Sequence, residues 1–403
     1  MKPILALALA STSLVGCLDP GADDAPSGPS VVSTDLNGDT WTTVDDTAGT
    51  DGLGLLYLGV EVAPNGHIWA VGQRTEAGDN TQWVVRESTN GGASFGFNSA
   101  VGFTGGFGAA EAVSTDSAGR IFVSGWGLDA NNTSHWITER STNDGATWTI
   151  VDDWSPSGAS ASATSISIDS NDTIFVGGGG DDSNSHTFWK VRFSTDHGAT
   201  WQQEDFVDRG PDDGIGGGVL GLCLNHSDLW SVGSRPIAHD TDGLVVRDSS
   251  TATDKVINND AWQANGCGGH GGTDPLYVAG QTVPQPSFDA HWIVSRSVGG
   301  GTFVRVDDLS TGNNNDDLTA AFAVHAGESG TIFAAGIVGR QWRVRKTPDG
   351  TTWEDSDKFT LSGETSSDIS QAQAFQFSSS LGHTYVVGFA TVNGVEHGII
   401  RRN

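Results

Sequence analysis

One motif recurs at a nearly constant interval along the chain. It is a short apolar segment that ends in glycine, as in GHIWAVG and GRIFVSG, and its glycines are Gly72, Gly125, Gly177, Gly233, Gly280, Gly336 and Gly388. Consecutive glycines are 53, 52, 56, 47, 56 and 52 residues apart. A period of about 50 residues is typical of repeated units that bury their apolar residues only against their neighbours. The 403 residues therefore predict one domain of seven units, not two or three separate domains.

Each unit contains the same four segments. The first alternates in polarity, as in AVSTD at 112–116, and the second is the glycine-ended segment. The third segment opens with tryptophan in five units, at Trp83, Trp136, Trp189, Trp292 and Trp342. The fourth segment is a further strand, as in WTIVDD at 148–153. With 56 glycines and no sustained helical spacing of apolar residues, the sequence predicts short strands and tight turns. Four antiparallel strands per unit predict an all-β fold built from the blades of a β-propeller.

The two ends of the chain carry complementary parts of one unit. The seventh unit stops at GIIRRN, after its third strand. Residues 33–46, STDLNGDTWTTVDD, contain a fourth strand with no unit before it. We therefore predict that the N-terminal strand completes the last blade and closes a seven-bladed propeller of four-stranded antiparallel blades over residues 32–403. Closure removes unpaired sheet edges, which otherwise promote aggregation.

A second motif, S/T-x-D/N-x-G-x-T-W, lies between the third and fourth strands of several units. Its acid or amide can accept hydrogen bonds from turn N–H groups, its glycine permits a positive φ, and its aromatic residue fills space between blades. In other copies Leu36 replaces the acid or, before Trp353, one residue is missing. The complete copies comprise Ser88, Asn90, Gly92 and Phe95; Ser141, Asn143, Gly145 and Trp148; and Ser194, Asp196, Gly198 and Trp201.

This motif resembles the Asp-box, or BNR, repeat of sialidase-like β-propellers. The resemblance implies that the boxes are structural turns. It also implies that the ligand face is built by the loops joining the second strand to the third and the fourth strand to the next blade. Loss of some copies agrees with a structural role. We expect the tryptophans among the candidate ligand-face residues to be exposed for stacking on a sugar. The candidates are Glu111, Trp126, Trp154, Arg235, Asp317 and Arg340.

The sequence does not assemble the catalytic residues of a sialidase. That family uses three arginines, an acid and a Tyr–Glu pair, whereas Tyr277 and Tyr385 occupy core positions and only Tyr57 is placed near the expected face. Two functions remain. The one we favour is a non-catalytic module that binds a glycan, a peptide or a partner protein. The alternative is a secreted glycoside hydrolase, which needs two carboxylates about 5–9.5 Å apart, with Glu111 and Asp317 as the residues to compare.

Clusters of metal ligands are not predicted. His135, His291 and His397 occupy equivalent positions before third strands, but their blades are too far apart for a shared ion, so we expect a capping role. Adjacent acids such as Asp152 and Asp153 point to opposite faces of a strand. We expect no cofactor, and Ca²⁺ is an alternative only at acidic loops such as 313–317.

The N-terminus has the pattern of a secretion signal. Residues 1–16 contain an apolar stretch too short to span a bilayer, which predicts a cleaved signal peptide. The segment LVGC, ending at Cys17, resembles the lipobox of bacterial lipoproteins, which implies acylation of that cysteine and stable anchoring. Residues 17–31 then form a flexible tether. The resemblance and Leu18 together imply the outer membrane, with the protein periplasmic or surface-exposed.

The remaining cysteines and the net charge limit the partners further. Cys223 and Cys267 lack the spacing of a zinc site, so in an oxidising compartment they either form a disulfide or are buried separately. A formal net charge of −29 repels phosphate backbones and argues against nucleic acid. We expect a monomer that contacts the membrane through its anchor and binds a glycan or protein ligand.

Overall fold

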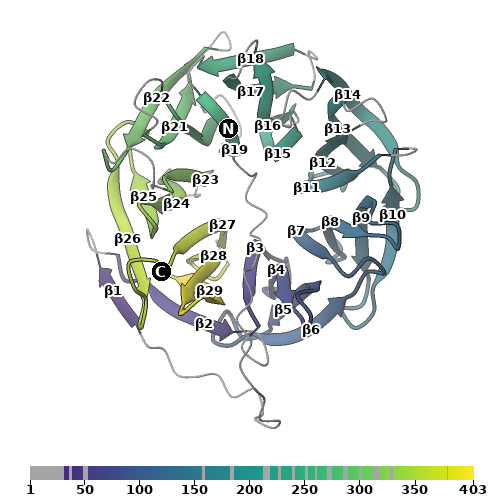
Figure 1. Cartoon of the computed structure of the whole chain (residues 1–403), viewed down its shortest axis with the longest axis horizontal. Coiled ribbons are helices and arrows are strands. Elements are labelled where there is room, and N and C mark those ends of the chain that lie inside the picture. The colour runs from purple at the N-terminus through teal and green to yellow at the C-terminus, as the bar shows by residue number, and fades with distance from the viewer. Residues whose placement is uncertain are drawn as a thin grey trace.

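The computed structural model contains strands and loops arranged around a central axis (Figure 1). It describes residues 31–35, 39–48, 53–156, 159–181, 186–211, 218–225, 228–237, 241–249, 253–258, 261–269, 275–284, 289–298, 302–312, 318–326, 330–378 and 380–403. No helix occurs in these ranges, and so none that could cross a membrane. The predicted signal peptide and Cys17 lie outside them, as does the predicted tether except for its last residue, Val31, which begins a strand.

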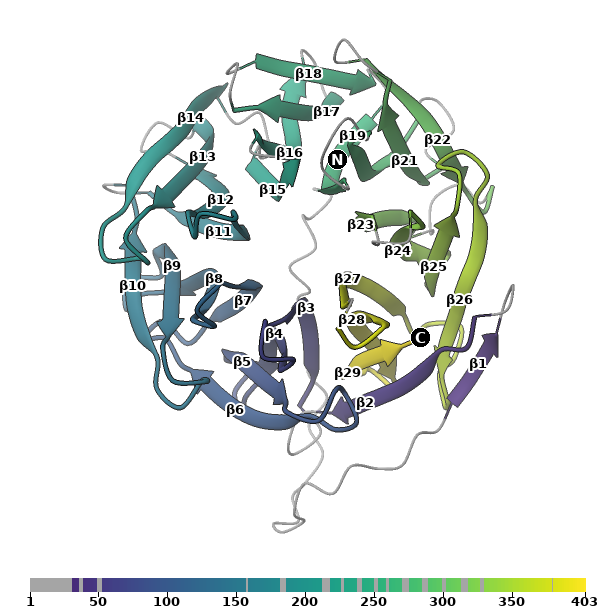
Figure 2. The same cartoon turned by 180° about the vertical axis from the view of Figure 1, so that it is seen from behind.

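Most described strands belong to four-stranded antiparallel groups, each of which we call a blade. The innermost strands surround the axis, as both views show (Figures 1 and 2). They are β3 (Leu55–Val62), β7 (Gly108–Thr115), β11 (Ala161–Ile168), β15 (Gly218–Asn225), β19 (Ala261–Gly268), β23 (Ala320–Ala326) and β27 (Ser370–Ser378). The second strands are β4 (Ile68–Thr75), β8 (Ile121–Leu128), β12 (Ile174–Asp181), β16 (Asp228–Ile237), β20 (Tyr277–Thr282), β24 (Ile332–Val338) and β28 (His383–Val392).

The outer half of each blade follows the same order. The third strands are β5 (Thr81–Ser88), β9 (Ser134–Ser141), β13 (His186–Ser194), β17 (Thr241–Asp248), β21 (His291–Ser297), β25 (Gln341–Thr347) and β29 (Val395–Arg402). The outermost are β6 (Gly96–Val101), β10 (Thr149–Trp154), β14 (Gln202–Pro211), β18 (Thr253–Asn258), β22 (Phe303–Leu309), β26 (Glu354–Leu361) and β2 (Thr42–Ala48). One pairing, Gly179 with Gly218, links the third and fourth blades into a single sheet.

The N-terminal segment occupies two places. β2 pairs with β29, in a register that sets Thr42 opposite Arg402, and so supplies the outer strand of the C-terminal blade. Residues 33–35, which we expected in the same box and strand, instead belong to β1 (Val31–Asp35). β1 pairs with β26 and adds a fifth strand to the preceding blade. An unpaired outer strand offers free backbone hydrogen-bonding groups, which explains this addition.

The two recurring motifs meet at the boundaries between blades. Trp83 of β5 is fully buried, and a Cβ added to Gly125 of the next blade would lie 2.8 Å from its ring. The same arrangement recurs for Trp136 with Gly178, Trp189 with Gly233, Trp292 with Gly336 and Trp342 with Gly388. A Cβ there would also clash with a carbonyl oxygen of the innermost strand of the same blade, as at Gly125, where Ala109 O would be 2.1 Å away. The glycine is therefore required both by this strand and by the preceding indole. In the third blade the equivalent residue is Gly178, so our assignment of Gly177 was wrong by one position.

Candidate functional site

The complete boxes form hydrogen-bonded turns between third and fourth strands. In the second blade, Ser141 Oγ accepts a hydrogen bond from Gly145 N at 2.9 Å, and Asn143 Oδ1 accepts one from Thr147 N at 2.9 Å. Gly145 has a φ of 74°. Trp148 packs edge-on against a tryptophan of the preceding blade. Equivalent serine-to-glycine bonds close the turns at Gly92 and Gly198. These hydrogen bonds are internal to each turn and account for the motif without a ligand.

Among the described residues, five blade boundaries carry an ion pair between an outer strand and the third strand of the next blade. Its aspartate follows a β-bulge, which turns the side chain toward the neighbouring blade. The pairs are Asp45 with Arg86, Asp152 with Arg192, Asp205 with Arg247, Asp307 with Arg345 and Asp357 with Arg401. In the adjacent acidic pairs seen in the sequence, the first carboxylate thus links two blades through an arginine.

The second carboxylate of several acidic pairs binds a histidine. His135 Nδ1 lies 2.7 Å from Asp153, and His291 and His397 make the equivalent contacts with Asp308 and Asp46. Each contact joins neighbouring strands within one blade. These histidines and acids therefore have local partners in separate blades and do not converge on one ion.

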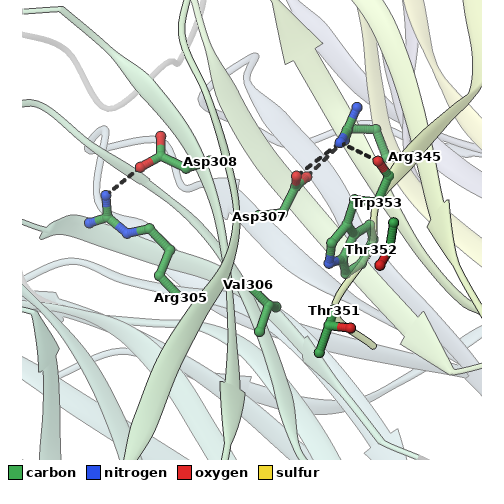
Figure 3. Close-up of a pocket in the computed structure, with 8 residues that line it drawn as sticks. All are labelled: Arg305, Val306, Asp307, Asp308, Arg345, Thr351, Thr352 and Trp353. Atoms are coloured by element: carbon green, nitrogen blue, oxygen red, sulfur yellow. Dashed lines mark hydrogen bonds and ion pairs between the residues drawn. The ribbon is translucent and has the colours of Figure 1, made fainter. Parts of the chain in front are cut away.

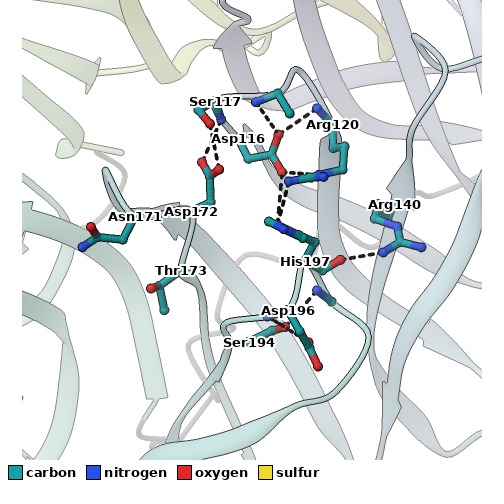
Figure 4. Close-up of polar contacts among 12 residues, drawn as sticks. Asp116, Ser117, Arg120, Arg140, Asn171, Asp172, Thr173, Ser194, Asp196 and His197 are labelled. Carbon is teal, nitrogen blue, oxygen red and sulfur yellow. Dashed lines mark hydrogen bonds and ion pairs between the residues drawn. The ribbon is translucent and has the colours of Figure 1, made fainter.

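One group of acids and a histidine has the proximity of metal ligands. Ligand atoms of Asp116, Asp172 and His197 lie within 4.8 Å of one another (Figure 4). However, Arg120 donates to Asp116 at 2.5 Å and lies 2.6 Å from His197 Nδ1, while Asp172 accepts two hydrogen bonds from Ser117. A guanidinium among the donor atoms opposes a cation, so we interpret this group as a link between neighbouring blades.

The innermost strands bring two unusual carboxyl groups close to the axis. Glu111 occupies the β-bulge of β7 and accepts a hydrogen bond from Trp126 Nε1 at 3.0 Å. Although it is partly accessible, desolvation raises its pKa to about 7. Desolvation also raises the pKa of Glu61, near the end of β3, to about 7, against the opposing hydrogen bond from the Thr115 hydroxyl. Carboxyl groups that titrate near neutral pH are suited to proton transfer.

The two glutamates lie on innermost strands that contact each other. A Cβ added to Gly59 would lie 3.1 Å from both Glu111 O and the Ala112 Cα, so β3 and β7 are in close contact there. Glu61 lies two residues further along β3, a rise of about 6.6 Å. Catalytic carboxylate pairs of glycosidases are about 5–9.5 Å apart, which is comparable with this backbone offset. The Glu111 carboxyl, however, bonds to Trp126, which pairs with Ala109 at the start of β7, whereas the Glu61 carboxyl bonds to Thr115 at its end.

Glu61 also lines a pocket of 430 Å³. The pocket lies at the turns that follow β3, β7 and β27, and its wall combines hydroxyl groups with an aromatic ring. These turns are at the same end of the blades as the boxes, so the pocket is on the face opposite to the one that the resemblance assigned to the ligand. Lining residues include Pro64, Thr115, Ser117, Phe377, Ser378 and Ser380. The hydroxyl groups around Glu61 and Asp116 form a polar site of the size that small ligands occupy. Sequence reasoning missed Glu61, because nothing in the strand LLYLGVEV marks its glutamate as facing another blade.

A third glutamate, Glu139 of β9, is buried without a hydrogen-bond partner among the described residues. Desolvation raises its pKa to about 7. It stands two residues before the box serine, where the third blade has Arg192, and the facing bulge position on β6 carries Ser99 instead of aspartate. The first and second blades therefore meet without the ion pair found at five other boundaries.

Two of the predicted ligand-face residues differ from expectation. Trp126 lies in β8, half-buried and bonded to Glu111. Trp154 lies in β10, where it packs edge-on against Trp136 at 6.2 Å, and Lys190 Nζ stands 4.3 Å from its ring centre. Neither is an exposed loop residue, because the strands continue further than their polar flanks indicated.

The other predicted residues are dispersed. Arg340 occupies the tight β24–β25 turn with a φ of 74° and donates to Ser367 O at 3.4 Å. The side chain of Arg235 and the whole of Asp317 lie outside the described residues, as does the acidic loop 313–317. Tyr57, placed near the ligand face by sequence, is instead fully buried and donates to Asp45 at 2.6 Å.

The two cysteines of the fourth and fifth blades form a disulfide. Cys223 of β15 and Cys267 of β19 have Cα atoms 5.7 Å apart, within the range that a disulfide spans. The bond joins two innermost strands of adjacent blades. It therefore crosslinks the wall of the central region.

Comparison with solved structures agrees with this architecture. An α-L-arabinanase of Penicillium chrysogenum, solved with arabinobiose, aligns with a TM-score of 0.50 at 13% identity, over 81% of this chain and 98% of that one. A protein of unknown function from Dyadobacter fermentans gives 0.47 at 15% identity, over 90% and 98%. The α-L-arabinofuranosidase Arb93A of Fusarium graminearum gives 0.48 at 10%, over 88% and 94%. The arabinanase likeness shows the β-propeller fold.

The two named neighbours are glycosidases. No protein-family model matches the chain, and no curated protein matches its sequence. The class of protein that the fold and the comparison define is thus an all-β protein of propeller type.

Proposed function

We propose that this protein is a glycoside hydrolase whose acid and base are Glu111 and Glu61. The observation that carries the proposal is the presence of two carboxyl groups with a raised pKa on adjacent innermost strands. One is enclosed beside an indole and the other opens on a pocket rich in hydroxyl groups. This function replaces the non-catalytic role that we favoured from the sequence, which becomes the second outcome of the test below.

The two environments suggest separate roles. Glu111 is held beside Trp126 in a desolvated position, which keeps its carboxyl protonated near neutral pH and suits it to protonate the glycosidic oxygen. Glu61 receives the Thr115 hydroxyl and borders the pocket, where its carboxylate can activate water or attack the anomeric carbon. The carboxylate separation in the substrate complex decides between inversion and retention.

The substrate class rests on the fold comparison. The propeller of the Penicillium enzyme was solved with arabinobiose, so arabino-oligosaccharides are the first substrates to test on this chain. A neutral sugar also suits the described lining of the Glu61 pocket, which contains no arginine.

Hydrolysis of 4-nitrophenyl α-L-arabinofuranoside and of debranched arabinan tests the proposal, with a panel of other aryl glycosides alongside. We expect turnover by the mature chain and a decrease in kcat of about 100-fold or more in Glu111→Gln and in Glu61→Gln. Glu139→Gln is the matched control, because that glutamate has a similarly raised pKa but lies on a third strand. Sugar binding without turnover, or turnover that both variants retain, contradicts the proposal and favours a binding module.

We further propose that the enzyme works outside the cytoplasm as a monomer anchored through Cys17 at the outer membrane. The disulfide between Cys223 and Cys267 supports an oxidising compartment. We also propose that the blades form one closed seven-bladed ring of the Asp-box type, which the pairing of β2 with β29 supports. Metabolic labelling with a palmitate analogue, lost in Cys17→Ser, tests the anchor.

A further inference from the structure

A second pocket lies on the outer part of the propeller, between the blades of β22 and β25, and its volume is 480 Å³ (Figure 3). Trp353 and Val306 both line it. Arg345 binds Asp307 through two nitrogens, at 2.8 and 3.0 Å. Arg305 donates to Asp308 at 2.6 Å. The pocket thus combines an aromatic wall with two paired guanidinium–carboxylate groups.

The box that borders this pocket is the copy with one residue missing. Its acid, Asp349, accepts hydrogen bonds from the N–H groups of Thr351 and Thr352, whereas the acid of a complete box bonds to the residue four positions on. Both threonines are exposed, and both line the pocket beside Trp353. The shorter turn therefore presents two exposed threonines next to an indole.

The boundary between the second and third blades provides a natural comparison. It has the same ion pair, Asp152 with Arg192, and the same box tryptophan. At the positions of Arg305 and Thr351, however, it carries Ile150 and Ala199. The polar groups that distinguish the pocket are therefore additions to the repeated framework and are not required by it.

The chemistry of the wall indicates the ligand. Two arginines and two aspartates give no net charge, which favours a neutral ligand over a phosphate or an acidic sugar. Fixed planar donors and acceptors match vicinal hydroxyl groups, and an indole accepts the apolar face of a sugar ring. The volume lies within the range of small-ligand pockets. We propose that this rim pocket is a carbohydrate-binding site for a neutral oligosaccharide, separate from Glu61 and Glu111.

Binding at the rim pocket does not require catalysis at Glu61 and Glu111. It adds a polysaccharide-binding site to the proposed hydrolase. A rim site that holds a polysaccharide would raise the local concentration of chain ends at the axis, as expected when two sites engage one ligand. Its residues come from β22, β25 and the following box, whereas the axial glutamates come from β3 and β7.

Native affinity electrophoresis of the mature chain in gels that contain soluble arabinan, xylan, galactan or β-glucan tests the site. Calorimetry with oligosaccharides of the retarding polymer then gives the Kd. We expect at least one neutral polymer to retard the protein. The double variant Arg305→Ile, Thr351→Ala, which copies the residues of the neighbouring boundary, should weaken binding at least 10-fold with unchanged Tm. Ile150→Ala is the surface control and should bind as wild type.

Three results would overturn the rim site: no retardation by any polymer, retardation that the double variant retains, or binding that is lost in Glu61→Gln, Glu111→Gln. A failure of the proposed hydrolase function gives a different result from a failure of the rim site. If aryl glycosides are not hydrolysed but the rim variants abolish polysaccharide binding, only the hydrolase assignment falls. If the double variant hydrolyses small aryl glycosides normally but binds polymers weakly, both assignments stand.

Discussion

The carboxylate of Asp45 lies 3.1 Å from the guanidinium of Arg86, and this ion pair joins the N-terminal strand β2 to the third strand of the first complete blade. Asp45 also accepts a hydrogen bond from Tyr57 of β3. Because β2 is itself paired with β29, one aspartate connects strands from both ends of the chain. The same Asp–Arg contact at four other boundaries makes it the repeated electrostatic link between blades.

The most buried of these pairs should be the most sensitive to mutation. Arg401 and Asp357 both have side chains that are 0% exposed. Arg401→Met leaves a buried carboxylate without its partner, so we expect a decrease in the free energy of unfolding of about 3–5 kcal/mol. Urea unfolding measures it. The double variant Asp357→Leu, Arg401→Met should recover part of the loss, and a loss equal to that of the single variant would contradict this explanation.

The boundary between the first and second blades, where Glu139 has no arginine or aspartate partner among the described residues, should make stability depend on pH. Burial raises the pKa of Glu139 from 4.5 to about 7, so the folded protein holds more protons between these values than the unfolded chain does. The free energy of unfolding should therefore fall as the pH rises from 4.5 to 7, and Glu139 accounts for up to about 3 kcal/mol of that fall. Glu139→Gln should flatten the pH profile measured by urea unfolding.

Restoring the missing pair provides the complementary test. Ser99→Asp with Glu139→Arg places the residues of the other boundaries at this one, and the double variant should be more stable at pH 7 than either single variant. If the change in the free energy of unfolding of the double variant equals the sum of the changes in the two single variants, these positions do not interact.

The box glycines should respond according to their surroundings. Gly145 has a φ of 74°, and an added Cβ would lie 2.7 Å from Trp69, whereas Gly119, with a φ of 78°, has open space around it. Gly119→Ala should cost only backbone strain, about 1 kcal/mol, and Gly145→Ala should cost more because it also disturbs the packing between blades. Equal changes in Tm for the two variants would exclude a packing role for the box.

Reduction of the disulfide should lower the thermal stability of the protein. Cys223 and Cys267 are 44 residues apart, and a crosslink over that span stabilises the folded state by about 4 kcal/mol at most. We expect the Cys223→Ser, Cys267→Ser variant to have a lower Tm than wild type and to be insensitive to dithiothreitol. A wild-type Tm that does not change on reduction would contradict the contribution of the bond.

The sequence by itself determined the repeated strands and the turns that join them, because these depend on local features. Alternating polarity, the glycine-ended segments and the hydrogen-bonding side chains of the boxes act over a few residues, so they are visible in a linear pattern. The match between the incomplete seventh unit and the N-terminal segment also indicated the pairing that β2 makes with β29.

Only the tertiary structure decided what the buried polar residues do. Packing between blades gave the repeated aspartates their arginine partners and buried Tyr57. Within the second blade, the pairing of β7 with β8 placed Trp126 on Glu111 instead of in solvent. Glu61 and Glu111 are 50 residues apart in the chain, and the contact of their two strands and the burial that raises both pKa values appear only in the folded protein. Desolvation depends on every neighbour that excludes water, which no local pattern in a single sequence records.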